Sequence, residues 1–143
     1  MTGFLGSYRH SLDSKGRVSL PAPFRRSSDA ESFVLIQVHE DALTLFPDGT
    51  WAEVEQRLRE MRERRPDFRH RILSLTGSAQ RVAPDSQGRI LIPERLRTSA
   101  GLGDEALIVG ALDKIEVWDP ERFAEHTAGE NEEFDELTAS VFA

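Results

Sequence analysis

The sequence contains the stretch Asp13-Ser14-Lys15-Gly16-Arg17-Val18-Ser19-Leu20-Pro21, and the same motif returns as Asp85-Ser86-Gln87-Gly88-Arg89-Ile90-Leu91-Ile92-Pro93. The offset of 72 residue numbers needs no gap over residues 13–53, and it also aligns Arg25 with Arg97, Asp41 with Asp113, and Leu43–Phe46 with Ile115–Trp118. Upstream, Gly6-Ser7 matches Gly77-Ser78 at an offset of 71, so one residue is added near Pro84. An internal match of this kind indicates that the chain is built twice from one unit.

The size of the repeat predicts that the two units share a core. Each unit holds about 45 residues, and a chain that short buries too little surface to be stable alone. We expect a first unit at residues 4–49, a helical insert at 50–76, a second unit at 77–120 and an acidic helical tail at 121–143. The sequence has no cysteine, no signal-peptide pattern and no apolar run long enough for a membrane span. A soluble cytosolic protein is therefore expected.

The charge of the chain is unevenly distributed. The net charge is −7, and residues 119–143, with eight acids against Arg122, supply all of it. Residues 1–118 are neutral overall, while residues 1–28 carry five basic side chains against Asp13. The acidic total by itself argues against a polyanion as partner, but the basic end of the first unit leaves such a partner open.

Each unit is predicted to form two hairpins around a short helix. Alternation over residues 4–12 and 17–20 is typical of strands, and the four residues between them form a turn in which Gly16 supplies a positive φ. Asp13 can accept a hydrogen bond from a backbone N–H two residues on. Pro21 ends the strand and begins a helical turn over residues 22–26, and residues 33–39 and 43–46 form the second hairpin.

The insert and the tail are predicted to be helical. Thr50 and Glu53 form a capping-box pair, an apolar stripe follows, and Pro66-Asp67 breaks the helix before a second one that Gly77 ends. Seven arginines in the insert suggest a nucleic-acid arm, but five interleaved acids favour a solvated, salt-bridged surface. Asp119-Pro120 predicts a helix start. Residues 131–142 carry an apolar face that packs either on the body or on a neighbour; it consists of Phe134, Leu137, Val141 and Phe142.

The tandem Asp-Ser-x-Gly-Arg-[Val/Ile]-x-[Leu/Ile]-Pro motifs, separated by a helical insert, resemble the MraZ family of bacterial transcriptional regulators over nearly the whole chain. The resemblance implies an AbrB/SpoVT-like fold: mainly β with a helical insert (α+β), in which two units interlock as a swapped-hairpin or double-split β-barrel. It also implies a DNA-binding repressor that acts at short direct repeats upstream of its own cell-division and cell-wall operon. Closed homo-oligomeric rings and a nucleoid-associated, cytoplasmic location follow from the same resemblance.

The residues of the motif suit contact with double-stranded DNA. An arginine that donates two hydrogen bonds to guanine O6 and N7 is the commonest specific base contact, and a two-stranded ribbon fits the major groove. Under this hypothesis Arg17 and Arg89 contact the bases, while Asp13 and Asp85 orient them by charge-assisted hydrogen bonds. The turn and strand ends depend on Gly16, Pro21, Gly88 and Pro93. Further candidate contacts are Lys15, Gln87, Arg9 and Arg25 together with Arg26 and Arg97.

Other interpretations remain open at this stage. Spacing alone favours Asp–Arg pairs that only pin each hairpin, and the resemblance favours DNA contact for the two arginines. Gln87 stands where the first loop has Lys15, so the second loop either contacts DNA more weakly or only helps to assemble the barrel. Four scattered histidines and the lack of any phosphate loop, nucleophile elbow or zinc motif argue against an enzyme, a cofactor, a metal or a small-molecule substrate. An oligomeric scaffold that binds other proteins is the second candidate.

Overall fold

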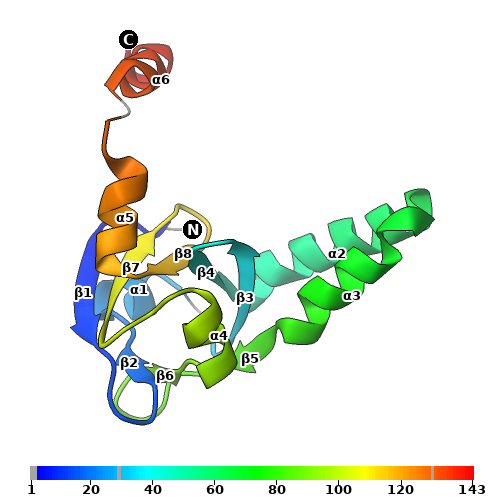
Figure 1. The fold of residues 1–143 in the computed structure, drawn as a ribbon, viewed down its shortest axis with the longest axis horizontal. Helices are drawn as coiled ribbons and strands as arrows, with labels where there is room; N and C mark the ends of the chain where they lie inside the picture. The colour runs from blue at the N-terminus through cyan, green and yellow to red at the C-terminus, as the bar shows by residue number, and fades with distance from the viewer. Residues whose placement is uncertain (1–2, 29, 130) are drawn as a thin grey trace.

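Strands from the two sequence repeats are interleaved in one shared sheet (Figure 1). The fold is given by a computed structural model that describes residues 3–28, 30–129 and 131–143. The first repeat forms β1 (Ser7–Ser11), β2 (Arg17–Ser19), α1 (Ala22–Arg26), β3 (Phe33–His39) and β4 (Ala42–Pro47). The second forms β5 (Gln80–Val82), β6 (Arg89–Leu91), α4 (Glu94–Ser99), β7 (Glu105–Gly110) and β8 (Ile115–Trp118).

The sheet topology has an approximate two-fold symmetry. The larger sheet has the antiparallel order β1-β7-β8-β4-β3-β5, and exchanging equivalent strands of the two repeats gives the same order reversed. The symmetry axis passes through two pairs of equivalent residues, Thr44 opposite Glu116 and Val18 opposite Ile90. The α+β class, with an antiparallel sheet and a helical insert, is thus confirmed. In the described part of the chain, the ladders form a six-stranded sheet and a separate β2–β6 pair without closing into one barrel.

The register of the edge strands shows where the extra residue of the second repeat lies. Ser11 of β1 is opposite Glu105 of β7, and Val82 of β5 is opposite Phe33 of β3. Glu105 and Phe33 are equivalent at the offset of 72, whereas Val82 and Ser11 are equivalent at 71. The insertion is therefore accommodated after β5, next to Pro84, and both edge strands keep the same pairing.

Both repeats contribute to the main core. Phe24 of α1 is 1% exposed, and its ring packs edge-on against Phe4 and Tyr8 at centroid distances of 5.6 and 5.3 Å. Each fully buried leucine or isoleucine of this core contributes about 1.5–3 kcal/mol to stability. The largest buried side chains come from both repeats: Leu20, Phe24, Phe33, Leu35, Leu43, Leu45, Ile90, Ile92, Ile108 and Ile115.

The insert forms a helical arm that projects from the body (Figure 1). It comprises α2 (Asp48–Arg64), a 3-10 turn at Pro66–Phe68 and α3 (Arg69–Ser78). Trp51 anchors α2 in a second, smaller core with Phe46, as the apolar stripe predicts. The predicted capping pair is wrong, because α2 begins two residues before Thr50, directly after Pro47. The Thr50 hydroxyl instead donates to the backbone oxygen of Asp113 at 3.3 Å.

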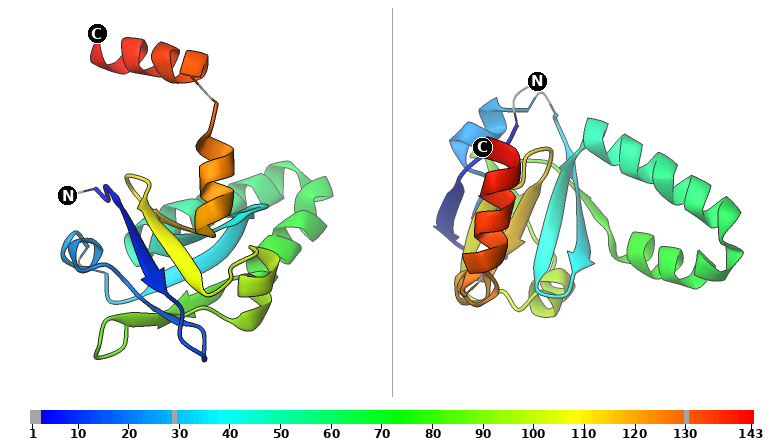
Figure 2. Two further views of the ribbon diagram at one scale, coloured as in Figure 1. Left: turned by 60° about the vertical axis from the view of Figure 1, so that its left-hand side comes forward. Right: turned by 90° about the horizontal axis from the view of Figure 1, so that it is seen from above.

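Two helices follow the last strand of the sheet. α5 (Pro120–Thr127) begins as predicted, with the Asp119 carboxylate accepting from the backbone N–H of Arg122 at 3.2 Å. Arg122 and His126 also bind Asp41 in the turn between β3 and β4, at 2.5 and 2.8 Å. α6 (Asn131–Phe142) stands away from the body (Figure 2). Within the described ranges, no helix combines the length and the apolar character that crossing a bilayer requires.

Candidate nucleic-acid interface

The two motif loops lie together at one end of the molecule, opposite α6 (Figure 2). β2 pairs with β6, so each strand that leaves one loop is hydrogen-bonded to the strand that leaves the other. The pairing continues into the loops, where Leu20 N–H donates to the Gly88 oxygen at 2.9 Å and Ile92 N–H donates to the Gly16 oxygen at 3.0 Å. The two copies of the motif thus form one surface, which neither repeat makes alone.

Each loop is closed around its aspartate. Oδ1 of Asp13 accepts from the backbone N–H groups of Lys15 and Arg17, both at 2.9 Å, and Oδ2 accepts from Arg17 Nε at 2.8 Å. Asp85 makes the same contacts with Gln87 and Arg89, at 2.9, 2.9 and 3.1 Å. The predicted orientation of each arginine by its aspartate is therefore present in both loops.

The hydrogen bond from the Arg17 backbone N–H is the largest cause that lowers the pKa of Asp13 to about 2 from its usual 3.8, and the Arg17 side chain and Lys15 N–H add to it. Arg89 N–H lowers the pKa of Asp85 in the same way. Because the folded-state pKa lies below the unfolded one, the contribution to stability is present above pH 4 and is lost as the pH falls toward 2.

This linkage gives a test by acid melting. The Asp13→Asn variant has no carboxylate to protonate, so its melting temperature is expected to lie below that of the unchanged chain at pH 6, and the gap is expected to narrow between pH 4 and pH 2. Thermal melting followed by circular dichroism measures the gap. A gap of constant size over that range would show that the charge of Asp13 does not stabilise the loop.

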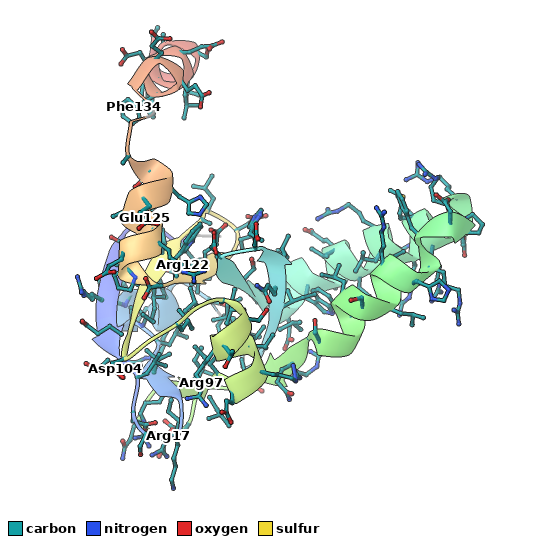
Figure 3. The ribbon with its side chains drawn as sticks, viewed as in Figure 1. Arg17, Arg97, Asp104, Arg122, Glu125 and Phe134 are labelled. Carbon is teal, nitrogen blue, oxygen red and sulfur yellow. The ribbon has the colours of Figure 1, made fainter. Side chains whose placement is uncertain are left out.

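Arginines from the short helices cover the loop glycines across the repeats. Arg25, in the first repeat, lies over Gly88 and donates from Nη1 to the oxygens of Leu20 at 3.1 Å and Gly88 at 3.5 Å. Arg97, in the second, lies over Gly16, and among the described residues its buried Nε has no hydrogen-bond partner (Figure 3). The repeats are thus joined by reciprocal contacts that local motif analysis missed, although the alignment of Arg25 with Arg97 was a signal for them.

Pro21 and Pro93 place these arginines. Each proline directly precedes a helix, α1 or α4, and its carbonyl oxygen accepts the backbone N–H of the arginine four residues on, at 3.1 Å for Arg25 and 3.0 Å for Arg97. Proline has a fixed φ that suits a helix start. The end of each motif therefore sets the position of the side chain that covers the opposite loop.

A side chain at either covered glycine would be strained. Gly16 and Gly88 have φ values of +86° and +77°, and a Cβ at position 16 would lie 2.6 Å from the guanidinium carbon of Arg97, while one at position 88 would overlap Arg25. We expect Gly16→Ala and Gly88→Ala each to lower the free energy of unfolding by about 1–2 kcal/mol or more. Gly49→Ala is the matched control, because no atom lies within 4 Å of its Cβ. Chemical denaturation measures the free energy of unfolding of all three variants. A loss in Gly16→Ala and Gly88→Ala that is no larger than in Gly49→Ala would contradict the strain expected at the two loop glycines.

The two central arginines are only partly exposed. The side chain of Arg17 is 32% exposed and that of Arg89 is 27% exposed. Nη1 of Arg89 lies 3.8 Å from Oδ2 of Asp13, so this guanidinium is shared between the loops. In the part of the chain that the structure describes, the terminal nitrogens of Arg17 have no partner, and Arg17 lies at the loop end of the molecule (Figure 3).

The remaining candidate residues differ in their surroundings. Lys15 and Gln87 are exposed at the loop tips, and their side chains have no partner among residues 3–28, 30–129 and 131–143. Arg9 lies on β1 and makes two hydrogen bonds to Glu105, at 2.9 and 3.1 Å, which raise the pKa of Arg9. The charge of Arg9 is therefore balanced within the sheet, whereas Lys15 adds an unbalanced positive charge to the loop surface.

Comparison with known proteins gives a family for this arrangement. A family model described as "MraZ protein, putative antitoxin-like" matches residues 4–70 and 75–142, and each segment holds one of the two loops. The "Transcriptional regulator MraZ" of Desulforamulus reducens is 33% identical over 138 residues, 96% of each chain. Proteins of the same name from Leuconostoc citreum and Acetivibrio thermocellus are 35% and 36% identical, over 96% and 90% of this chain and 96% and 89% of their own. These names describe regulators rather than enzymes.

Proposed function

The chain belongs to the MraZ family, and from this premise we propose that it regulates transcription by binding double-stranded DNA through the surface that its two loops share. In the specific form of the proposal, the chain represses its own division and cell-wall operon by binding short direct repeats upstream. Such a regulator acts in the cytoplasm, at the nucleoid. The names of the relatives support the regulatory role, and the paired loops support the mode of contact.

The geometry of Arg17 carries the proposal. Asp13 binds the Nε of this arginine and fixes the direction of its guanidinium, which leaves the two terminal nitrogens for another acceptor. Two parallel N–H donors suit O6 and N7 of guanine, and a pre-oriented guanidinium loses little entropy when it binds them. Arg89 also donates from Nε to the aspartate of its own loop, Asp85, but its Nη1 lies near Asp13 of the other loop. We therefore assign the stronger base contact to Arg17.

Positive charge on the loop surface offsets the acidity of the whole chain. Lys15, Arg17, Arg25, Arg89 and Arg97 lie on or next to the two loops, against Asp13 and Asp85. A polyanion senses this local potential more strongly than a net charge of −7 that comes from the tail. Lys15 and Gln87 suit contacts to phosphate, which position a protein on DNA without reading its sequence.

Self-association is the second part of the proposal. One loop pair with a few charges binds DNA weakly, and that affinity falls steeply with salt. An assembly that presents several loop pairs to successive repeats makes the later contacts intramolecular, which raises the avidity by roughly a hundredfold to ten-thousandfold. We propose that copies of the chain form a closed ring that binds direct repeats in this way.

The direct test is DNA binding by the full chain. A duplex from the region upstream of its own coding sequence is compared with a duplex of shuffled sequence, by fluorescence anisotropy over a series of salt concentrations. We expect at least roughly tenfold tighter binding to the first duplex and a linear fall of log K with log salt. Equal, weak binding to both would instead favour the oligomeric scaffold, for which the exposed apolar face of α6 is the supporting observation.

A further inference from the structure

The last helix carries an apolar face that no part of the described chain covers. Phe134, Leu137, Val141 and Phe142 are 63%, 60%, 63% and 82% exposed. The same helix carries four acids, Glu132, Glu133, Asp135 and Glu136, and no base. Single exposed apolar residues are ordinary on a protein surface, but a contiguous stripe on a detached helix marks a contact surface. Its partner is expected to be apolar at the centre and positively charged around it.

The outer part of the helical arm has these properties. We define the distal arm as residues 57–73, which carry seven arginines against Glu60, Glu63 and Asp67. Met61, Phe68 and Ile72 are half-buried there and belong to neither core, and Leu73 is 50% exposed. Arg65 is paired with Asp67. Arg59 is paired with Glu55, and the five remaining arginines of the distal arm have no ion pair with a described residue: Arg57, Arg62, Arg64, Arg69 and Arg71.

We propose that α6 of one copy packs along the distal arm of a neighbouring copy. Met61, Phe68 and Ile72 are only half-buried on the arm, and a third amphipathic helix packed along two others covers such side chains. α6 has 12 residues, which corresponds to roughly 18 Å of helix, close to the length of α3 with its 10 residues. The acids of α6 then face the unpaired arginines. In its own chain α6 lies across the body from the arm, so the partner is a second copy (Figures 1 and 2).

Charge disfavours the other hollows of the surface as sites for α6. A groove of about 860 Å³ near the start of the chain has Arg26 but also Asp48, Glu53 and Asp113 in its wall. A smaller hollow at α5 has Arg122 together with Asp41, Asp119, Glu121 and Glu125. Both would repel a helix with four acids. The arm also extends away from the end that bears the loops, which argues against DNA as its ligand (Figure 1).

The contact specifies how the proposed assembly forms, and in this respect it rests on the proposed function. Arm and α6 are different surfaces, so the association is head-to-tail, and such contacts close into a ring when the rotation between neighbours allows it. The loops take no part in the contact. A loop variant can therefore lose DNA binding while the assembly persists. The proposed DNA contact of the loops and the proposed contact between α6 and the arm are thus tested independently.

Charge reversal with rescue tests the pairing. We compare the native mass of the full chain with that of an arm variant (Arg62→Glu with Arg69→Glu), a helix variant (Glu133→Arg with Glu136→Arg) and a chain carrying all four substitutions. We expect each double variant to self-associate at least about tenfold more weakly and the fourfold variant to recover, because opposite charges again face each other. Glu31→Arg with Glu40→Arg is the matched control, on exposed residues outside both surfaces.

Disulfide formation locates the contact directly, because the chain has no cysteine of its own. Copies with Leu137→Cys in α6 are mixed with copies that carry a cysteine at one of two other positions. One is Leu73→Cys in the arm, and the other is Leu112→Cys in the wall of the 860 Å³ groove near the start of the chain. We expect faster cross-linking to position 73 than to position 112, since only side chains with Cα atoms about 4–7 Å apart join readily.

Two results would overturn the proposal. One is a combination: position 73 cross-links no faster than position 112, and the assembly of the arm variant has the same native mass as that of the unchanged chain. The other is an arm variant that keeps its native mass but binds the shuffled duplex more weakly, which would make the arm a DNA contact. Circular dichroism of each variant checks that the folds are equivalent.

Discussion

Replacing Arg17 by alanine is expected to lower the affinity for the upstream duplex by roughly tenfold to a hundredfold for each loop pair engaged. A two-donor arginine–guanine contact contributes about 1–3 kcal/mol of discrimination, and the assembly repeats the contact in every bound copy. Asp13 keeps its hydrogen bonds from the Lys15 and Arg17 backbones in this variant, so the loop retains most of its internal contacts. Anisotropy titration with the upstream and shuffled duplexes measures the loss.

Two further substitutions separate base reading from charge. Arg17→Lys keeps the positive charge but removes the planar pair of donors, so it is expected to retain the salt dependence and lose the preference for the upstream sequence. Arg89→Ala is expected to have a smaller effect than Arg17→Ala, because Arg89 shares a nitrogen with Asp13. Arg59→Ala, in an arginine that pairs with Glu55 on α2, is the control. Unaltered binding by Arg17→Ala and Arg89→Ala would remove both loops from the mechanism.

The Phe24→Ala variant is expected to lower the free energy of unfolding by about 3–5 kcal/mol. The ring is 1% exposed and packs on Phe4 and Tyr8, inside the core that both repeats share. Its loss leaves a cavity directly before Arg25, which covers the loop of the other repeat. A decrease of this size corresponds to a fall in melting temperature of roughly 10–17 °C for a domain of this length. Chemical denaturation at fixed protein concentration gives the free energy.

The same substitution also tests whether the two repeats fold as one unit. Trp51 packs on Phe46 of β4 in the first repeat and Trp118 lies in β8 of the second, so single-tryptophan variants report on one strand of each repeat. Because the strands of the two repeats are interleaved in one sheet, we expect both reporters to show the same transition in the unchanged chain and in Phe24→Ala. Leu5→Ala is the control, since that side chain is 71% exposed and lies outside the arm and α6. Two separate transitions would contradict a shared core.

Local sequence was sufficient to predict the loops themselves. Asp13 and Gly16 have the side-chain acceptor and the positive φ that their positions require, and Asp85 and Gly88 repeat both features. The internal repeat further predicted equal units that need each other. The fold class followed from the same repeat, together with the resemblance to a family of known architecture.

Contacts between the repeats could not be derived from local pattern. The position of Arg25 over Gly88 depends on how β2 pairs with β6, which brings together residues 63 apart. Thr50 shows that a local pattern can also predict a contact that does not form. Its sequence context suits a helix cap, but the helix begins earlier, at Asp48 directly after Pro47. The Thr50 hydroxyl instead donates to the backbone oxygen of Asp113. The apolar face of α6 was predictable from its spacing, whereas its exposure depends on the placement of the helix outside the body.

The central claim is that the two loops of one chain form a single DNA-reading surface. Ser14→Cys and Ser86→Cys provide single attachment points for an iron chelate that cleaves nearby DNA, and His70→Cys at the arm provides the control. The account predicts cuts from positions 14 and 86 that lie within each repeat of the upstream duplex and recur with the repeat spacing, and no such cuts from position 70. Cleavage that is uniform along the duplex, or that is strongest from position 70, would contradict it.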